Sequence, residues 1–234
     1  MPHTFGGKKV REPGARRRKM TRIAAAAIVA IIAGAGLYIY ISNTYISNQG
    51  TTTQESTSCT TGTPVLGAKG TYAKINTSLG SIEVQLYPSA APKTVANFVN
   101  LSQTGFYNNL VWHRIVAGFV IQTGDPNSRG GGNRSQWGLG GSGKTVPLEI
   151  CSTLHNDYGY LGMARSSDPN SGSSQFYINV NQTGNTNLNG QYTVFGKVIS
   201  GMHVAIAISK VPVNSTDQPI TPVFVTSIKI QDAP

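Results

Sequence analysis

The chain has 234 residues, of which 12% are charged and 39% hydrophobic. This balance excludes a disordered, highly charged chain, and 27 glycines with 12 prolines favour a turn-rich, strand-rich domain over a helical bundle. Most of the formal net charge of +10 sits at the N-terminus, because residues 1–22 carry eight Lys or Arg against Glu12, a net +7. The rest of the chain is only mildly basic, so we expect that it does not bind nucleic acid.

Residues 23–41 form an uncharged run of nineteen residues directly after the basic tail. A helix of this length is about 28 Å long, close to the hydrocarbon thickness of a bilayer. Basic residues precede the run and none cluster after it, so the positive-inside rule predicts a single-pass signal anchor in the cell membrane. The tail at 1–22 would be cytoplasmic and the rest extracytoplasmic. The alternative is secretion after signal cleavage, because Ala33-Gly34-Ala35 resembles a small-residue cleavage site.

Residues 42–68 are rich in Ser, Thr and Asn and are predicted to be a flexible linker. The chain has two cysteines, Cys59 in this linker and Cys151 further on. Two cysteines are too few for a disulfide scaffold, although outside the cell they could pair and tie the linker to the following domain. The sequence alone leaves open whether they pair or stay as separate thiols.

The folded part is expected to begin near residue 69 with two strands and a helix. Polar and less polar residues alternate over Ala73–Thr77, Leu79-Gly80-Ser81 breaks the pattern, and Ile82–Leu86 resumes it. Such alternation predicts a two-stranded hairpin with one buried face. Apolar residues at helical spacing follow, with Pro92 near their start and Gly105 at their end, which predicts a helix between these two residues.

Further along the chain, short apolar runs are separated by Gly-rich or polar segments. The expected elements are apolar stretches at 111–116 and 119–122, a Gly-rich surface excursion over 124–145, a helical turn at 148–154, strands at 159–164, 175–180, 192–199 and 223–230, and a second helix at 202–209. About eight short strands and two helices without a βαβ rhythm predict a mainly β domain over residues 69–234. We expect a closed eight-stranded antiparallel β-barrel capped by two helices and preceded by one transmembrane helix, since closure removes exposed strand edges.

Three segments resemble signature regions of one enzyme family. They are WHRIVAGFVIQTGD at 112–125, LGMARSSDPNSGSSQFYI at 161–178 and LNGQYTVFGKV at 188–198. In this order and spacing they resemble the cyclophilin family of peptidyl-prolyl cis-trans isomerases over about residues 70–231. Many animal members have histidine at the position of Tyr192. Tyrosine at this position resembles prokaryotic members.

The resemblance implies roles for ten residues. Arg114 matches the catalytic arginine, and Gln122 and Phe119 complete the expected catalytic set. The expected substrate-binding residues are Val120, Ala164, Arg165, Gln175, Tyr177, Leu188 and Tyr192. Within this set, Phe119, Val120, Tyr177 and Leu188 match proline-pocket walls, Gln122 and Gln175 match contacts to the substrate backbone, and Ala164 and Arg165 match the strip followed by residues before the proline.

Two positions depart from the family pattern. The indole position of animal members is Asn187 here, which puts high-affinity cyclosporin binding in doubt. The usual methionine of the pocket is Val120, a shorter wall. Neither change removes the arginine.

The chemistry expected from the resemblance needs no covalent step. Rotation about an X-Pro bond must break amide resonance, at a barrier of about 18–20 kcal/mol. The twisted prolyl nitrogen becomes a better hydrogen-bond acceptor, so a fixed guanidinium such as that of Arg114 favours the transition state selectively. The expected partners are therefore proline-containing polypeptides and, through residues 23–41, the membrane. No metal and no cofactor are expected, and His113 is interpreted as structural because no proton is transferred.

Two other functions are compatible with the sequence. One is a non-catalytic, membrane-tethered binding module for proline-containing segments. The other is a tethered adhesion or sugar-binding domain, supported only by the Gly-, Asn- and Thr-rich composition. Retention of Arg114, Gln122 and Phe119 favours the enzyme.

Overall fold

The computed structural model describes residues 71–233. The predicted basic tail (1–22), transmembrane segment (23–41) and linker (42–68) lie outside the described residues. No helix within residues 71–233 combines the length and the apolar character needed to cross a membrane.

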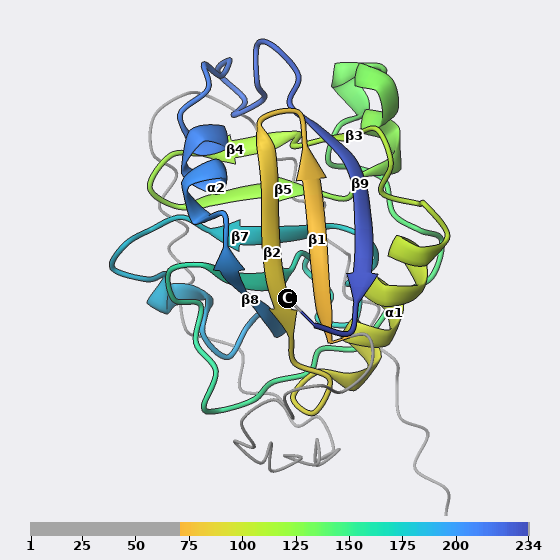
Figure 1. Ribbon diagram of the computed structural model, residues 1–234, viewed down its shortest axis with the longest axis vertical. Helices are drawn as coiled ribbons and strands as arrows, with labels where there is room; N and C mark the ends of the chain where they lie inside the picture. The colour runs from red at the N-terminus through yellow and green to blue at the C-terminus, as the bar shows by residue number, and fades with distance from the viewer. Residues whose placement is uncertain (1–70, 234) are drawn as a thin grey trace, which may run out of the picture. The chain divides into compact units, whose positions relative to one another are not determined.

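The predicted hairpin is confirmed as β1 (Tyr72–Thr77) and β2 (Gly80–Leu86). Its buried residues alternate as expected, and Ile75 and Ile82 are directly paired across the two strands with no exposed surface. The C-terminal strand β9 (Phe224–Gln231) pairs with the other edge of β1. The two ends of the described domain therefore lie side by side (Figure 1).

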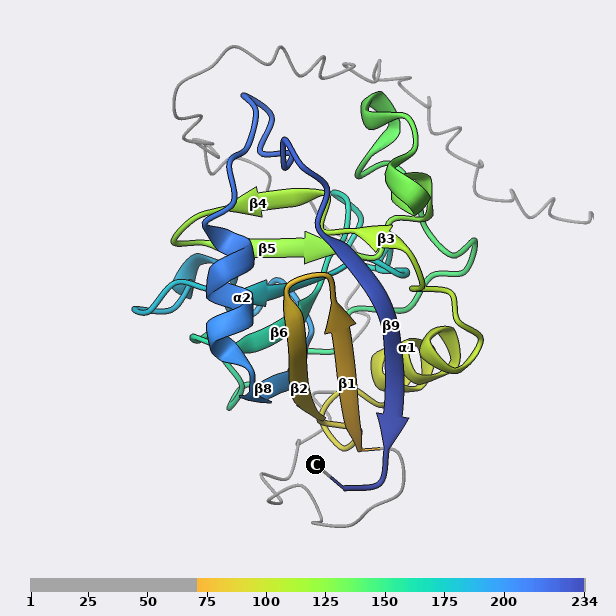
Figure 2. The same ribbon diagram turned by 45° about the horizontal axis from the view of Figure 1, so that its top comes forward.

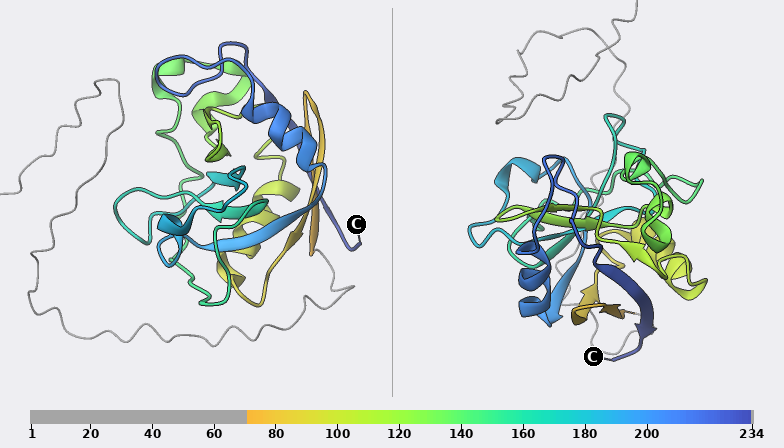
Figure 3. Two further views of the ribbon diagram at one scale, coloured as in Figure 1. Left: turned by 90° about the vertical axis from the view of Figure 1, so that its left-hand side faces the viewer. Right: turned by 90° about the horizontal axis from the view of Figure 1, so that it is seen from above.

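Both predicted helices are confirmed, as α1 (Pro92–Gln103) and α2 (Met202–Ser209). Pro92 occupies the first turn of α1, where a missing N–H costs nothing. The carboxylate that serves this helix start comes from far along the chain, because Glu149 accepts hydrogen bonds from the Lys93 and Thr94 backbone N–H groups at 3.0 and 2.8 Å. α1 contacts β9 and α2 contacts β2, so the two helices flank the group of β1, β2 and β9, with α2 on the left and α1 on the right in Figure 2 and in the right-hand view of Figure 3.

The strands form one antiparallel sheet. The remaining strands are β3 (Leu110–Val111), β4 (Arg114–Val116), β5 (Val120–Thr123), β6 (Tyr160–Met163), β7 (Phe176–Asn179) and β8 (Val194–Ser200). Within the described residues the order is β3-β9-β1-β2-β8-β6-β7-β5-β4. In Figure 1, β1, β2 and β9 run steeply while β4, β5 and β7 cross behind them, so the sheet wraps around a core.

The barrel prediction is confirmed only in its coarse form. The domain is mainly β with two α-helices, but the described residues form nine strands rather than eight. The pairings run as an open series from β3 to β4, and a closed barrel is not shown. The extra strand arises because the apolar stretch 111–116 divides at His113 into β3 and β4. On either side of this point the backbone bonds to different segments. The Trp112 N–H donates to the Val223 carbonyl at 2.9 Å, and the Ile115 N–H donates to the Asp217 carbonyl at 2.7 Å.

Aromatic rings fill the space that the sheet encloses. Phe176 has no exposed surface and lies edge-on to Phe98, Tyr107 and Phe195, with ring centroids 5.3, 5.6 and 6.3 Å away. Edge-to-face pairs of this kind contribute about 0.5–1.5 kcal/mol beyond the area they bury. Because Phe176 belongs to β7, this core fixes the position of a strand that carries part of the candidate site.

The long excursion over 124–145 is confirmed as largely irregular. It contains two short 3-10 helices, η1 (Pro126–Gly131) and η2 (Arg134–Gln136). The predicted helical turn at 148–154 forms no helix. Its backbone donors turn instead to neighbouring side chains, the Leu148 N–H to Asn170 Oδ1 and the Glu149 N–H to Thr193 Oγ1, and only one hydrogen-bonded turn remains, from the Leu154 N–H to the Cys151 carbonyl.

Cys151 lies in this irregular segment and is disulfide-bonded. The chain's other cysteine, Cys59, lies outside the described residues. Only one cysteine is thus described, and it is not a free thiol.

The burial of His113 predicts a pH-dependent stability. Its side chain is 3% exposed, and burial lowers its pKa to about 4, an effect that the negative charge of Asp125 opposes. Above pH 6.5 the residue makes no contribution to the pH dependence of the free energy of unfolding. Between pH 6.5 and 4 the unfolded chain takes up a proton that the folded chain excludes. The free energy of unfolding should therefore fall by at most about 1.4 kcal/mol per pH unit from this residue as the pH is lowered.

Urea unfolding of the wild type and of His113→Gln between pH 7 and 4.5 measures this contribution. The variant should lose part of the acid-side decline. His203→Gln, at an exposed histidine of α2, should keep all of it. Equal declines in the wild type and in His113→Gln would contradict the assignment.

Candidate active site

The site is set by the register of four antiparallel strands. Arg114 of β4 pairs with Gln122 of β5, Gln122 pairs with Tyr177 of β7, and Tyr177 pairs with Gly162 of β6. Residues directly opposite one another in an antiparallel sheet point to the same face. The three side chains therefore form one row on the outer face of the sheet.

The residues next to this row in the three strands point the other way. Ile115, Ile121 and Ile178 are at most 1% exposed and pack in the core. A slip of one residue in any pairing would exchange the polar row with this apolar row, so burial of the isoleucines holds the register. The core thus determines where Arg114 and Gln122 lie.

A cavity of about 250 Å³ opens on this face. It is lined by Arg114, Phe119, Val120, Gln122, Ala164, Arg165, Tyr177, Leu188 and Tyr192. These are nine of the ten residues predicted from the sequence. The tenth, Gln175, lines the neighbouring cavity, and its Oε1 accepts a hydrogen bond from Gln122 Nε2 at 2.8 Å. The structure brings the predicted residues together, while their individual roles stay predictions.

The apolar wall of the cavity combines segments that are far apart in the sequence. Val120 and Tyr177 are 2% and 4% exposed, and Phe119 and Leu188 are half-buried. Leu188 ends a 3-10 turn, η3 (Thr186–Leu188). Asn185, which precedes that turn, donates from Nδ2 to the Phe119 carbonyl at 3.1 Å. This bond ties the two apolar side chains to one wall.

Tyr177 lies against the backbone of β6. A Cβ atom at Gly162 would be 2.1 Å from Tyr177 Cζ, so only glycine leaves room for the ring. The Tyr177 hydroxyl donates to Asn156 Oδ1 at 2.7 Å, and burial raises the pKa of this tyrosine far above its ordinary value. Tyr192 meets the Tyr177 ring edge-on, with centroids 6.0 Å apart. The ring is held on three sides and has little freedom to move.

Arg114 stands at the polar side of the cavity. Its guanidinium carbon is 6.0 Å from the centroid of the Phe119 ring, and its Nε is 3.7 Å from Asp217 Oδ2. The Arg114 and Asp217 side chains are 41% and 44% exposed, so water screens this ion pair.

Asp217 is a residue that sequence reasoning missed. It lies in the loop between α2 and β9 with φ +60, and its backbone carbonyl accepts the Ile115 N–H while its own N–H donates to the Asn214 carbonyl. Asn214 Oδ1 in turn accepts from the Gln218 N–H. A turn-forming Asn-x-x-Asp-Gln segment is a signal for a rigid loop, but nothing in its spacing indicates that it meets Arg114.

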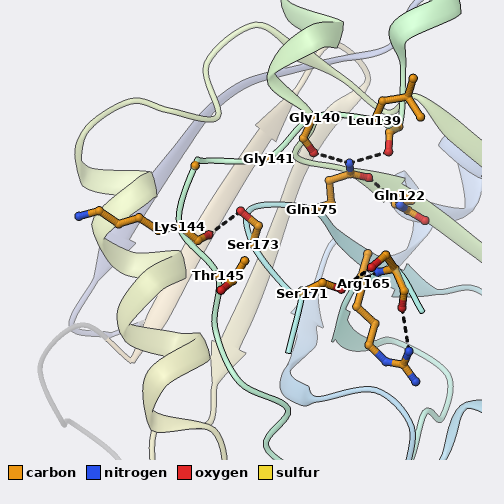
Figure 4. A pocket seen from close by; sticks show the side chains of 14 residues that line it. Gln122, Leu139, Gly140, Gly141, Lys144, Thr145, Arg165, Ser171, Ser173 and Gln175 are labelled. Atoms are coloured by element: carbon orange, nitrogen blue, oxygen red, sulfur yellow. Dashed lines mark hydrogen bonds between the residues drawn. The ribbon is translucent and has the colours of Figure 1, made fainter. Parts of the chain in front are cut away.

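A second, larger cavity adjoins the first. It has a volume of about 570 Å³ and shares Gln122, Ala164 and Arg165 with the cavity of Arg114 (Figure 4). Gln175 Nε2 donates to the Gly138 and Gly140 carbonyls at 3.0 and 2.7 Å, which holds the Gly-rich loop as one wall. The polar row of the sheet therefore continues from one cavity into the other.

The described part of the chain has no group of three or more His, Cys, Asp and Glu side chains arranged to hold a metal ion. The chemistry available at the site is that of a fixed cation, amide donors and an apolar wall. This set can orient a peptide and stabilise a developing lone pair, and it contains no nucleophile activated by a neighbouring base.

Comparison with known proteins identifies the family. The family model described as "Cyclophilin type peptidyl-prolyl cis-trans isomerase/CLD" matches residues 72–230. Over 164 residues the chain is 41% identical to the peptidyl-prolyl cis-trans isomerase-like 1 protein of Emericella nidulans, covering 70% of this chain and 96% of that protein. It is also 41% identical over 160 residues to the peptidylprolyl isomerase domain and WD repeat-containing protein 1 of Mus musculus, of which it covers 24%.

Solved structures give the same result. A cyclophilin type peptidyl-prolyl cis-trans isomerase of Cryptosporidium parvum superposes with a TM-score of 0.63 at 32% identity, covering 70% of this chain and 99% of that one. A structure of that protein in the presence of the dipeptide Ala-Pro superposes with a TM-score of 0.61 at 33% identity, covering 68% of this chain and 98% of that one.

The relatives described above are eukaryotic, so the comparisons do not support the expected prokaryotic character. The family model covers most of the described domain and does not reach residues 23–41. Since the family model spans nearly all of residues 71–233 and a relative is matched almost end to end, the chain belongs to the cyclophilin-type peptidyl-prolyl cis-trans isomerases, a family of enzymes.

Proposed function

We propose that this chain accelerates rotation about X-Pro bonds in exported or unfolded polypeptides, with Arg114 donating a hydrogen bond to the prolyl nitrogen. The observation that carries the proposal is the strand row of Arg114, Gln122 and Tyr177 beside an apolar cavity of about 250 Å³. That volume suits a proline ring and its neighbouring atoms. The structure of the Cryptosporidium relative in the presence of the dipeptide Ala-Pro supports a proline-containing substrate here.

The mechanism depends on how the prolyl nitrogen changes during rotation. In the planar amide its lone pair is delocalised into the carbonyl, and in the twisted state the lone pair is localised on nitrogen. A guanidinium aimed at that nitrogen therefore binds the twisted state more tightly than the planar one. A hydrogen bond to a charged group contributes about 1.5–3 kcal/mol, or about one to two decades of rate.

The cavity supplies the remaining stabilisation. Phe119, Leu188 and Tyr177 can hold the five-membered ring while the preceding residue turns. Gln122, fixed by its bond to Gln175, can hold a neighbouring carbonyl. An apolar cavity also disfavours the more polar planar amide relative to the twisted one. The protein thus needs only to hold one side of the bond and to stabilise the rotated form.

An extracytoplasmic place of action is supported by two separate features. Cys151 is disulfide-bonded, and disulfides persist in oxidising compartments outside the cytosol. The charge-free run at 23–41 follows a basic tail, as in a membrane anchor or a signal peptide. We therefore propose that the domain acts on polypeptides that have crossed the membrane, either anchored through 23–41 or released by cleavage.

The enzyme proposal is tested by Arg114→Ala. The full chain, purified in a mild detergent, should accelerate cis-trans exchange of an Ala-Pro test peptide measured by NMR exchange spectroscopy. Arg114→Ala should lower kcat/KM at least about tenfold, because the charged donor is lost. Lys229→Ala, at an exposed cation on β9, should match the wild type. Peptide binding by the wild type without acceleration would instead favour the non-catalytic binding module.

The packing of Tyr177 on Gly162 gives a second prediction. In Gly162→Ala the new methyl group would overlap the ring, which must leave the cavity wall, so activity should fall about tenfold or more while the fold persists. Tyr177→Phe keeps the ring and should retain most of the activity. Folding is followed by circular dichroism. A folded Gly162→Ala chain with wild-type kcat/KM would show that this wall is dispensable.

The ion pair at Arg114 gives a third prediction. An exposed ion pair contributes about 0.2–1 kcal/mol. In Asp217→Asn the Arg114 guanidinium loses this partner and is less fixed in position, so kcat should fall by no more than about fivefold with little change in KM. The wild-type kcat should fall as salt screens the pair, and the variant's should not. Asp157→Asn, at an exposed carboxylate, is the matched control. Identical salt dependence in Asp217→Asn and the wild type would rule out a positioning role.

A further inference from the structure

We infer that the cavity of about 570 Å³ binds an acidic side chain of the substrate, close in sequence to the proline, and that Arg165 makes this selection. The inference rests on the proposed function and names the substrate class that the site prefers.

The two cavities are continuous along the path of a bound peptide. They share Gln122, Ala164 and Arg165, so a chain leaving the Arg114 cavity on that side passes directly over the larger one. Each extended residue advances about 3.3–3.6 Å, so a side chain one to three residues from the proline can reach it. Because the larger cavity lies on one side only, it can read residues on one side of the proline and not on the other.

The lining of the larger cavity carries positive charge without a counter-charge. Its charged members are Lys144 and Arg165, and the others are glycines, hydroxyl residues, two glutamines, Ala164 and Leu139. Neither cation is ion-paired with a carboxylate of the described residues. An anion brought by a substrate would therefore meet two unopposed cations.

The acidic residues of this region are committed elsewhere. Glu149 accepts three hydrogen bonds at the start of α1, from the Lys93 N–H and from the N–H and hydroxyl of Thr94. Asp125 is fully buried and accepts the Asn127 and Gly138 N–H groups. Asp168 caps its own loop, where its Oδ1 accepts the Asn170 N–H at 2.9 Å. None of these carboxylates lines the cavity.

Arg165 is held in place for such a contact. Its Nε donates to the Gln191 carbonyl at 2.9 Å and its Nη1 to the Ser166 carbonyl at 2.8 Å. Its guanidinium carbon lies 4.7 Å from the centroid of the Tyr192 ring. Within residues 71–233, Nη2 makes no hydrogen bond to the protein, so a fixed guanidinium offers a donor at the border of both cavities. A donor already immobilised loses little entropy on binding a carboxylate.

Lys144 contributes in a different way. Its side chain is exposed, and in Figure 4 its ammonium group points away from the other labelled side chains, across the cavity from Arg165. It therefore adds to the attraction felt by an approaching anion rather than forming a fixed contact. The direct contact, and most of the selectivity, is assigned to Arg165.

Peptides that differ at one residue test the inference. The full chain in mild detergent is assayed by NMR exchange spectroscopy on Ala-rich peptides with one proline, carrying Glu, Gln or Lys at one to three residues before or after it. At low salt we expect kcat/KM for Glu over Lys to be about fivefold or more at positions on one side of the proline, with Gln between them. The ratio should shrink in 0.5 M salt, where the Debye length is about 4 Å. For positions on the other side of the proline, the ratio should stay near one.

Variants separate the cations. Arg165→Gln should reduce the Glu-to-Lys ratio to below about twofold, Lys144→Gln should reduce it only in part, and Lys229→Gln should leave it unchanged. Because the ratio is internal to each variant, a general loss of activity does not obscure it. Equal kcat/KM for the three peptides, or an unchanged ratio in Arg165→Gln, would overturn the inference. A wild type that accelerates none of the peptides would overturn the proposed function instead.

Discussion

The site depends on one constraint, the antiparallel register of β4, β5, β7 and β6. In that register Arg114, Gln122 and Tyr177 share a row on one face of the sheet, and the isoleucines beside them are buried on the other. Burying the isoleucine row and presenting a cation are therefore the same structural event. A register shift would place a guanidinium in the core, which is costly enough to exclude the alternative. Stability and site geometry are thus coupled through strand pairing.

The rest of the domain supports this row from three directions. The aromatic cluster around Phe176 fixes β7 from the core side of the sheet. Asn185 brings Leu188 to the wall that contains Phe119, and the Gly-rich loop is held to Gln175 at the far end. The loops thus carry little of the positioning of Arg114, apart from the exposed pair with Asp217. They shape what surrounds the proline, which is where preference among substrates would arise.

The sequence predicted the local elements and which residues gather around one cavity, and it did not predict the long-range pairings. Alternation over 73–86 and helical spacing after Pro92 are local signals, and both elements formed as expected. The ten site residues lie in long motifs that resemble a family, which is why nine of them line one cavity. Division of 111–116 into β3 and β4, and the ion pair with Asp217, depend on contacts with segments about a hundred residues later. The irregular course of 148–154 depends on Asn170 and Thr193 in the same way, and no local pattern encodes such contacts.

The central claim is that Arg114 reaches the prolyl nitrogen of a peptide whose ring lies against Phe119 and Leu188. NMR of the isotope-labelled chain with an Ala-Pro peptide tests it most directly, through the Arg114 guanidinium signals and intermolecular nuclear Overhauser effects. The account predicts that the guanidinium signals shift with the proline peptide, but not with a peptide in which glycine replaces proline, and that ring protons of the proline contact Phe119 and Leu188. Unperturbed Arg114 signals, with proline contacts on another face of the domain, would contradict it.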